Sequence, residues 1–294
     1  MTETAITPEQ AARTAALEAG LSVQGLVPIH QQATLVYHLP AERLVARVTP
    51  AGESESMKRS IALARWLAAQ DFWIVEAADV PQLISHGPHV VTFWKHYQQE
   101  GGHPPPYAYF LGLLLRRLHS LPEPPVALPA HRPLTAVKDA VAVSTTLTDD
   151  DRRWMEHRVQ GLTAAYDALD FPLGTGLIHG RAFPGNTIWD DRRHVWPLIG
   201  EWETAAIGPR EIDLVSTFHG AVRYGRRPRC IRAFIRAYGY DPQPWRGMPL
   251  LLQIRDLESL APWIRRADAG DQDARRTLLY RLSTLQLGDT EAEW

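Results

Sequence analysis

Three consecutive prolines at positions 104–106 divide this sequence more sharply than any other feature. Proline lacks a backbone N–H donor and restricts the residue before it, so the stretch 101–106 excludes regular secondary structure at that point. Strand-like segments lie before this stretch, and long helical segments lie after it. We therefore predict two lobes, residues 1–97 and residues 98–294, with the boundary just before the prolines.

The first lobe contains a small antiparallel sheet and two helices in this prediction. The first helix begins after Thr7, which is a good N-cap, with Pro8 in the first helical position, and it ends at Gly20. The second helix covers residues 57–70, where apolar side chains recur at helical spacing. Strands are predicted in the β-rich segments 26–28, 33–37, 43–48, 72–75 and 90–94.

The second lobe is mostly helical in this prediction. Leucines at helical intervals predict a buried helix over residues 107–121, and a proline-rich loop follows to residue 134. Residues 149–168 form a second long helix, whose acidic first turn complements the helix dipole. Helical periodicity continues through residues 212–240 and 249–286.

Composition excludes several classes of protein. The 294 residues are 45% hydrophobic, which is enough for a sizeable core. The sequence has 31 Lys and Arg residues and 33 Asp and Glu residues, which gives a net charge of −2. It therefore lacks the excess of positive charge that would predict a nucleic-acid or anionic-membrane partner. Cys230 is the only cysteine, which excludes an internal disulfide and a cysteine-ligated metal. With no signal-peptide pattern and no apolar run of about 18–20 residues, we expect a cytoplasmic protein whose oligomeric state stays open.

One segment, residues 176–214, carries most of the chemical information. It contains, in order, His179-Gly180-Arg181, Asn186, Glu201-Trp202-Glu203, Gly208-Pro209 and Asp213. This joint spacing resembles the aminoglycoside phosphotransferase family, whose fold is that of the protein kinases. The resemblance implies an α+β, protein-kinase-like bilobal fold with an antiparallel-sheet N-lobe on the nucleotide side and a mostly helical C-lobe on the acceptor side.

The resemblance also implies roles for residues in this segment, and the chain departs from the family pattern at two of them. Arg181 stands where the family has the aspartate that takes the acceptor proton, and arginine has no acceptor atom. Glu201 stands at a metal-binding aspartate position, and Asn186 at the other metal ligand. His179 either organises this loop or is an ordinary loop histidine bonded to backbone. Asn186 can equally be a turn residue, Glu201 a solvated carboxylate, and Arg181 a charge partner of Glu201.

The first lobe departs from the family pattern as well. Arg47 occupies the place of the strand lysine that contacts nucleotide phosphates, and arginine can bind phosphate bidentately. Its expected acidic partner on the helix aligns with Ser60, unless the alignment slips to Glu53 or Glu55. Thr92 and Trp94 lie where the nucleotide-binding hinge is expected. The hairpin over residues 29–34 contains no glycine, so its backbone is less free to close over phosphates.

Weaker patterns have two interpretations each. His86, His89 and His96 offer imidazoles without an acidic or cysteine partner nearby, which argues against a metal site. Three acids in the C-terminal helices, Asp256, Glu258 and Asp268, lie where the family often builds an acidic wall for its acceptor, and solvated helix faces explain them equally well.

Two hypotheses for function follow. In the first, the chain is a pseudokinase-type protein that has lost or impaired phosphotransfer and binds a nucleotide, a small molecule, a peptide or a partner enzyme, with or without a cofactor. In the second, it is an active phosphotransferase that uses ATP or GTP with Mg²⁺ and acts on a hydroxyl of an antibiotic, an amino sugar or a similar acceptor. Phosphoryl transfer depends mainly on positioning and charge stabilisation, so the loss of the base need not abolish it.

Overall fold

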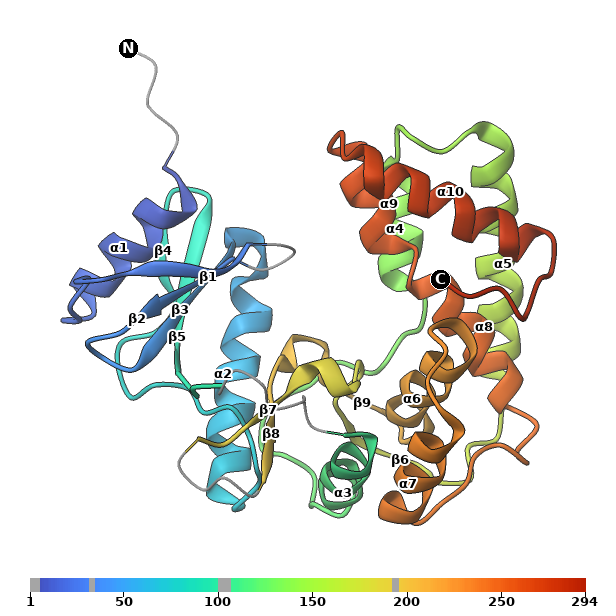
Figure 1. Ribbon diagram of the computed structural model, residues 1–294, viewed down its shortest axis with the longest axis horizontal. Helices are drawn as coiled ribbons and strands as arrows, with labels where there is room; N and C mark the ends of the chain where they lie inside the picture. The colour runs from blue at the N-terminus through green and yellow to red at the C-terminus, as the bar shows by residue number, and fades with distance from the viewer. Residues whose placement is uncertain (1–5, 32–34, 100–106, 192–195) are drawn as a thin grey trace. The chain divides into compact units, whose positions relative to one another are not determined.

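The computed structural model describes residues 6–31, 35–99, 107–191 and 196–294. By its internal contacts the chain divides into two compact units (Figure 1). Unit 1 comprises residues 1–106, 122–128 and 184–205, and unit 2 comprises residues 107–121, 129–183 and 206–294. The proline stretch 101–106, where the sequence predicts the lobe boundary, lies outside the described residues, and the two-lobe assignment stays a prediction.

Unit 1 is built on a five-stranded antiparallel sheet in the order β1-β2-β3-β5-β4. The strands are β1 (Val27–Gln31), β2 (Leu35–Leu39), β3 (Leu44–Pro50), β4 (Ile84–His86) and β5 (His89–Lys95). The sequence does not predict β4. The strand expected at 72–75 is wrong, because that segment forms only single-residue contacts with its neighbours, including a bridge from Ile74 to Ile199.

Two helices complete the first part of unit 1, α1 (Pro8–Glu18) and α2 (Ser54–Ala69). The predicted start of α1 is confirmed: Thr7 caps the helix by accepting from the Gln10 N–H, and the Gln10 side chain accepts from the Thr7 N–H. Four fully buried alanines of α1 let its backbone approach the sheet, namely Ala11, Ala12, Ala15 and Ala16. A separate hairpin, β7 (Thr187–Trp189) with β8 (Pro197–Ile199), also belongs to this unit.

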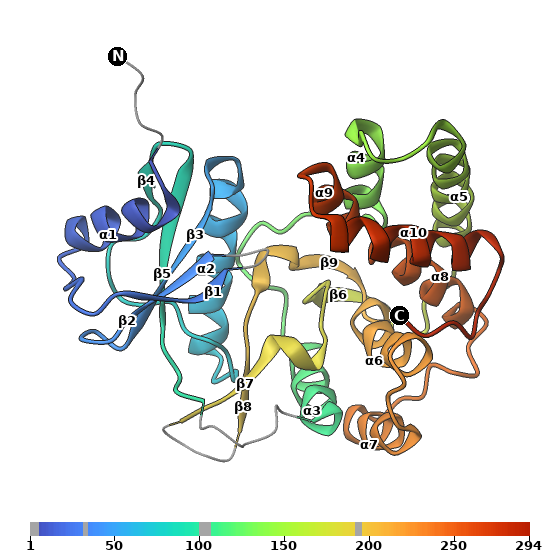
Figure 2. The ribbon, with the colours of Figure 1, turned by 45° about the horizontal axis from the view of Figure 1, so that its top comes forward.

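Unit 2 is mostly helical (Figure 2). Its elements are α3 (Ala108–Leu118), α4 (Thr135–Val143), α5 (Asp149–Asp167), the strand pair β6 (Thr175–Ile178) and β9 (Ala206–Pro209), α6 (Glu211–Arg223), α7 (Pro228–Tyr238), α8 (Met248–Glu258), α9 (Ala261–Asp268) and α10 (Gln272–Gln286). The predicted helices at 107–121 and 149–168 are confirmed, and the periodic regions 212–240 and 249–286 resolve into two and three helices. The sequence does not predict α4. No helix in the described ranges combines the length and apolar character that crossing a bilayer requires.

Candidate active site

The two faces of the sheet in unit 1 have different roles. Side chains alternate between faces along a strand, so residues two apart share a face with their cross-strand partners. Arg47 of β3 lies opposite both Val36 of β2 and Thr92 of β5, and Val45 lies opposite Trp94. The intervening residues on the other face, including Ala46, Val48, Val91 and Phe93, pack in the core against α1. The face that carries Arg47, Thr92 and Trp94 is therefore the one on which a binding site can form.

A cavity of about 190 Å³ lies on that face. Four of the residues singled out from the sequence line it, Arg47, Trp94, Asn186 and Glu201. The remaining lining residues are small or apolar: Val36, Val45, Val75, Gly185, Ile188 and Gly200. Thr92 is fully buried beside the cavity, and its hydroxyl accepts the indole N–H of Trp94 at 3.0 Å. The sequence predictions for these positions thus come together in one place, although their binding roles stay predictions.

Arg47 forms an ion pair with Glu203, which lies in the short 3₁₀ turn Trp202–Thr204. Both side chains are mostly buried, with exposures of 14% and 18%. Ser60, the position aligned with the expected acidic partner, is 1% exposed within α2. No local pattern pointed to Glu203 as the partner, because the two residues are separated by 156 positions.

The β7–β8 hairpin places Asn186 and Glu201 at the cavity. The Gly200 N–H donates to the Asn186 carbonyl at 3.0 Å, which holds the two ends of the hairpin together. On its other side β8 is fixed because the Val75 N–H donates to the Ile199 carbonyl at 3.0 Å. Glu201 has φ 63° and ψ 63°, a left-handed conformation that is uncommon for a residue with a side chain. Such backbone conformations cluster at functional sites.

The donor set at this cavity suits a hard divalent cation. Asn186 and Glu201 supply one amide and one carboxylate oxygen, and Mg²⁺ is typically bound by one or two such protein ligands together with water and substrate phosphates. Among the described residues, no group of three or more His, Cys, Asp or Glu side chains is arranged to hold a metal without such help. The residues present therefore fit a metal that arrives with a nucleotide.

The loop that follows β6 in unit 2 is held by one buried carboxylate. Asp213 of α6 is 0% exposed and accepts from the backbone N–H groups of His179 and Gly180, both at 2.8 Å. It also accepts from His119 Nε2 at 3.0 Å, and the other ring nitrogen of His119 lies 2.8 Å from the Tyr238 hydroxyl. Gly180 has φ +80°, a conformation that glycine adopts without strain. The loop is thereby fixed from α3, α6 and α7 together.

Electrostatics favour the charged form of this carboxylate. Burial alone raises the pKa of Asp213, but the hydrogen bond and positive potential from His119 and the backbone N–H of His179 outweigh burial, so its pKa is lowered. The His179 side chain is buried and the Arg181 side chain is exposed. The predicted pairing of Arg181 with Glu201 stays a prediction, because the two residues belong to different units.

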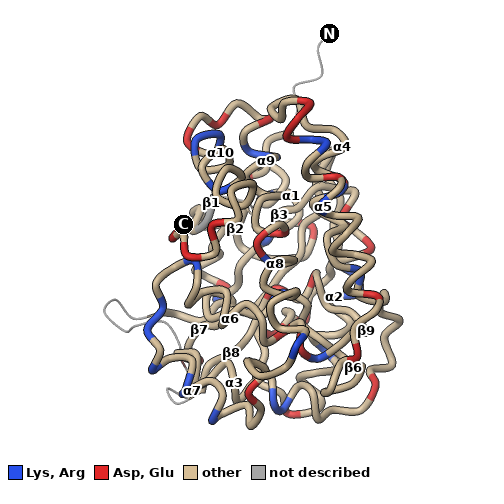
Figure 3. The backbone as a smooth tube through the Cα atoms, turned by 90° about the vertical axis from the view of Figure 1, so that its right-hand side faces the viewer, with Lys and Arg blue, Asp and Glu red and all other residues tan. Residues whose placement is uncertain are grey.

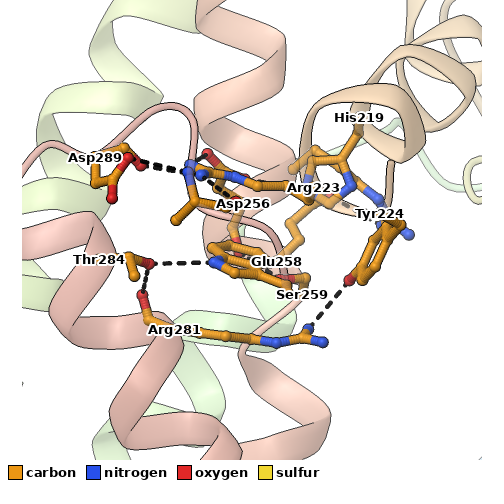
Figure 4. Close-up of polar contacts among 12 residues, drawn as sticks. His219, Arg223, Tyr224, Asp256, Glu258, Ser259, Arg281, Thr284 and Asp289 are labelled. Atoms are coloured by element: carbon orange, nitrogen blue, oxygen red, sulfur yellow. Dashed lines mark hydrogen bonds and ion pairs between the residues drawn. The ribbon is translucent and has the colours of Figure 1, made fainter. Parts of the chain in front are cut away.

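The acids of the C-terminal helices make internal contacts. Asp256 accepts from Arg223 Nε and Nη2, each at 2.8 Å, and from His219 Nε2 at 3.0 Å (Figure 4). Asp268 accepts from the Ser144 hydroxyl and from the backbone N–H groups of residues 145 and 146. Glu258 accepts from the backbone N–H of residue 134 and pairs with Arg255. These contacts hold α4, α6, α8 and α9 in place, and an acceptor-binding role for the three acids stays a prediction.

Comparison with known proteins identifies the family. Residues 26–250 match the Phosphotransferase enzyme family, APH. The chain belongs to this family. A comparison with curated proteins finds no significant match. The matched range includes both the cavity of unit 1 and the loop after β6, so the resemblance predicted from residues 176–214 is confirmed.

Solved structures of family members share the fold. The GDP and kanamycin complex of APH(2")-IIIa has a TM-score of 0.65 at 16% identity, covering 94% of this chain and 98% of that one. Spectinomycin phosphotransferase APH(9)-Ia, in complex with ADP and spectinomycin, has a TM-score of 0.65 at 14% identity, with coverages of 96% and 94%. A choline/ethanolamine kinase family protein from Mesorhizobium loti has a TM-score of 0.63 at 16% identity, with coverages of 96% and 94%. The fold is therefore kinase-like, as the sequence predicts.

Proposed function

We propose that this chain is a nucleotide-binding member of the APH family in which phosphotransfer is lost or impaired, and that it acts as a pseudokinase-type binding or partner protein. The observation that carries the proposal is Arg181. Asp213 fixes the backbone of residues 179 and 180, so the backbone of this loop is held in place. The residue that follows, Arg181, aligns with the family's catalytic base. A guanidinium stays protonated and offers no acceptor for a hydroxyl proton.

The cavity of unit 1 supports nucleotide binding in this proposal. Its apolar side chains, with Trp94, suit a base, and Arg47 suits a phosphate. GDP and ADP are bound in the family structures described above, which supports ATP or GTP as the nucleotide here. Asn186 and Glu201 would hold the Mg²⁺ that accompanies it and that neutralises phosphate charge. Because Arg47 is paired with Glu203, phosphates must compete with that carboxylate for the guanidinium.

An active phosphotransferase is the second candidate, favoured by the presence of Arg47, Asn186 and Glu201 around one cavity. In that reaction an acceptor hydroxyl oxygen forms a bond to the γ-phosphorus while the bond to the nucleoside diphosphate oxygen breaks. The hydroxyl proton then leaves to solvent or to a phosphate oxygen, since Arg181 cannot accept it. The acceptor would be an antibiotic, an amino sugar or a similar alcohol, by analogy with the kanamycin and spectinomycin complexes of family members.

Nucleotide binding and turnover can be measured separately. Trp94 lines the cavity, so tryptophan fluorescence should report titration with ADP or GDP, with and without Mg²⁺. Release of ADP or GDP from the triphosphate, with a panel of hydroxyl acceptors, reports transfer. We expect binding without appreciable turnover, and a gain in turnover of about 10²-fold or more in Arg181→Asp, the contribution typical of a positioned base.

Arg265→Asp is the matched control, because Arg265 is an exposed arginine on α9 and should leave turnover unchanged. Efficient transfer by the unmodified protein, lost in Glu201→Gln, would establish the active enzyme instead. Absence of nucleotide binding in every condition would contradict both candidates.

A further inference from the structure

The exposed face of α7 carries a row of arginines. Ile231, Phe234, Ala237 and Tyr238 point into the protein, and α7 packs closely against α3. The opposite face presents Arg229, Arg232 and Arg236, all exposed. These positions follow the i, i+3, i+7 spacing of one helical stripe, so their Cα atoms span roughly 10 Å along the axis. Figure 3 shows blue segments following one another along α7.

Two further arginines extend this row at its ends. Arg227 is exposed and immediately precedes α7. Arg116 is exposed on α3, and its guanidinium lies beside Gly239, the residue that ends α7. We call this set, Arg116, Arg227, Arg229, Arg232 and Arg236, the α7 arginine face.

The α7 arginine face has no acidic counterpart among the residues that the structure describes. Residues 214–240 contain six arginines and no Asp or Glu. None of the five guanidinium groups of the face lies in an ion pair with a described carboxylate. Nine other arginines of the described residues form ion pairs with carboxylates, namely Arg13, Arg43, Arg47, Arg153, Arg223, Arg246, Arg255, Arg266 and Arg276. Single exposed arginines elsewhere in the described residues, such as Arg65, Arg265 and Arg275, also form no ion pair with a carboxylate, so the face is distinguished by five such arginines gathered in one place.

Like charges at this spacing repel one another. Cations three or four residues apart on a helix are neighbours, and a Debye length of about 8 Å at physiological salt leaves them only partly screened. An anionic partner laid along the stripe removes this repulsion. Arginine is also among the residues enriched at protein interfaces, where its planar fork binds carboxylates bidentately.

We propose that the α7 arginine face docks an acidic helix of a partner protein, with carboxylates at i, i+3 or i+4, and i+7. Such a helix places its charges at the same axial spacing as Arg229, Arg232 and Arg236, which gives charge complementarity over the whole row. A nucleic acid fits less well, because a row of about 10 Å meets only two or three phosphates, against the 6–10 that strong salt-dependent binding uses. An anionic membrane fits less well because the apolar residues of α7 are already buried against α3.

Binding of a designed probe tests this proposal. The probe is a fluorescein-labelled helical peptide with glutamates at i, i+3 and i+7, titrated with the full chain and followed by fluorescence anisotropy at two salt concentrations. We expect binding that weakens as salt rises, and a loss of at least about tenfold in affinity in the triple variant Arg229→Glu, Arg232→Glu, Arg236→Glu.

The matched control is the triple variant Arg65→Glu, Arg265→Glu, Arg275→Glu, which makes the same charge change at exposed arginines on α2, α9 and α10. It should retain at least half of the affinity, and circular dichroism should show both variants folded. Equal losses in the two triple variants would overturn the proposal, since net charge alone would then explain binding. Tighter binding of a 20-nucleotide single strand, or of phosphatidylserine-containing vesicles, through Arg229, Arg232 and Arg236 would also overturn it in favour of that ligand.

Discussion

Arg47 and Glu203 form an ion pair from which water is mostly excluded, at the edge of the proposed nucleotide cavity. Removing one member of such a pair leaves the other charge without its partner in a poorly solvated place, which costs more than breaking an exposed pair. The pair also keeps the guanidinium on the cavity face of the sheet. At the level of single residues, Arg47 pairs with Glu203 and not with an acid of α2, and its role as the strand cation of the family stays a prediction.

Glu203→Gln should therefore destabilise the protein by about 1–3 kcal/mol in denaturant unfolding, between the values for exposed and fully buried pairs. Glu55→Gln, an exposed acid on α2 that the sequence offers as an alternative partner, should change the free energy of unfolding by less than about 0.5 kcal/mol. A larger effect at Glu55 than at Glu203 would contradict the observed pairing.

Close packing of α3 against α7 links the loop after β6 to the arginine face at the level of elements. Gly112 of α3 makes this approach possible, because a Cβ there would lie 2.8 Å from the Phe234 carbonyl and 2.9 Å from Ala237 Cβ. The same helix pair supplies His119 and Tyr238, which support Asp213. Separating the two helices should thus loosen that loop as well.

Gly112→Ala should destabilise the protein by about 1–3 kcal/mol through overpacking, despite the higher helix propensity of alanine. Gly161→Ala is the matched control. Gly161 lies within α5, and nothing lies within 4 Å of the position that an added methyl group would take, so alanine there should stabilise by up to about 1 kcal/mol. Opposite signs for the two substitutions in thermal or denaturant unfolding are the expected result, and equal signs would contradict the packing described.

At the scale of the whole molecule, buried histidines make the free energy of unfolding depend on pH. This dependence falls at higher pH values than those at which carboxylates titrate. Burial lowers the pKa of His219, a shift that Arg255 and Arg223 reinforce and Asp256 opposes. Burial likewise lowers the pKa of His131. Below about pH 6.5 the unfolded chain binds protons at these positions that the folded chain does not, so the stability they contribute is present above about pH 6.5 and is lost as pH falls toward their folded pKa values.

His219→Gln should therefore flatten the decline of melting temperature between about pH 6.5 and 5.5, because one such proton no longer drives unfolding. The wild-type decline attributable to each histidine is at most about 1.4 kcal/mol per pH unit. His157→Gln, at an exposed position of α5, should leave the profile unchanged. If the melting temperature of His219→Gln depended on pH in the same way as that of the wild type, His219 would make no contribution to the pH dependence of stability.

Local sequence pattern determined much of this protein. Alternation, helical spacing and caps predicted most strands and helices, since those signals act over a few residues, and the joint spacing from His179 to Asp213 identified the family. Tertiary structure decided the partners of charged groups. It assigned Glu203 to Arg47, committed Asp256 to Arg223 and His219, and left the α7 arginine face unpaired although the net charge is only −2. The physical reason is that Coulomb and hydrogen-bond energies depend on distance in space, which composition and sequence separation do not contain.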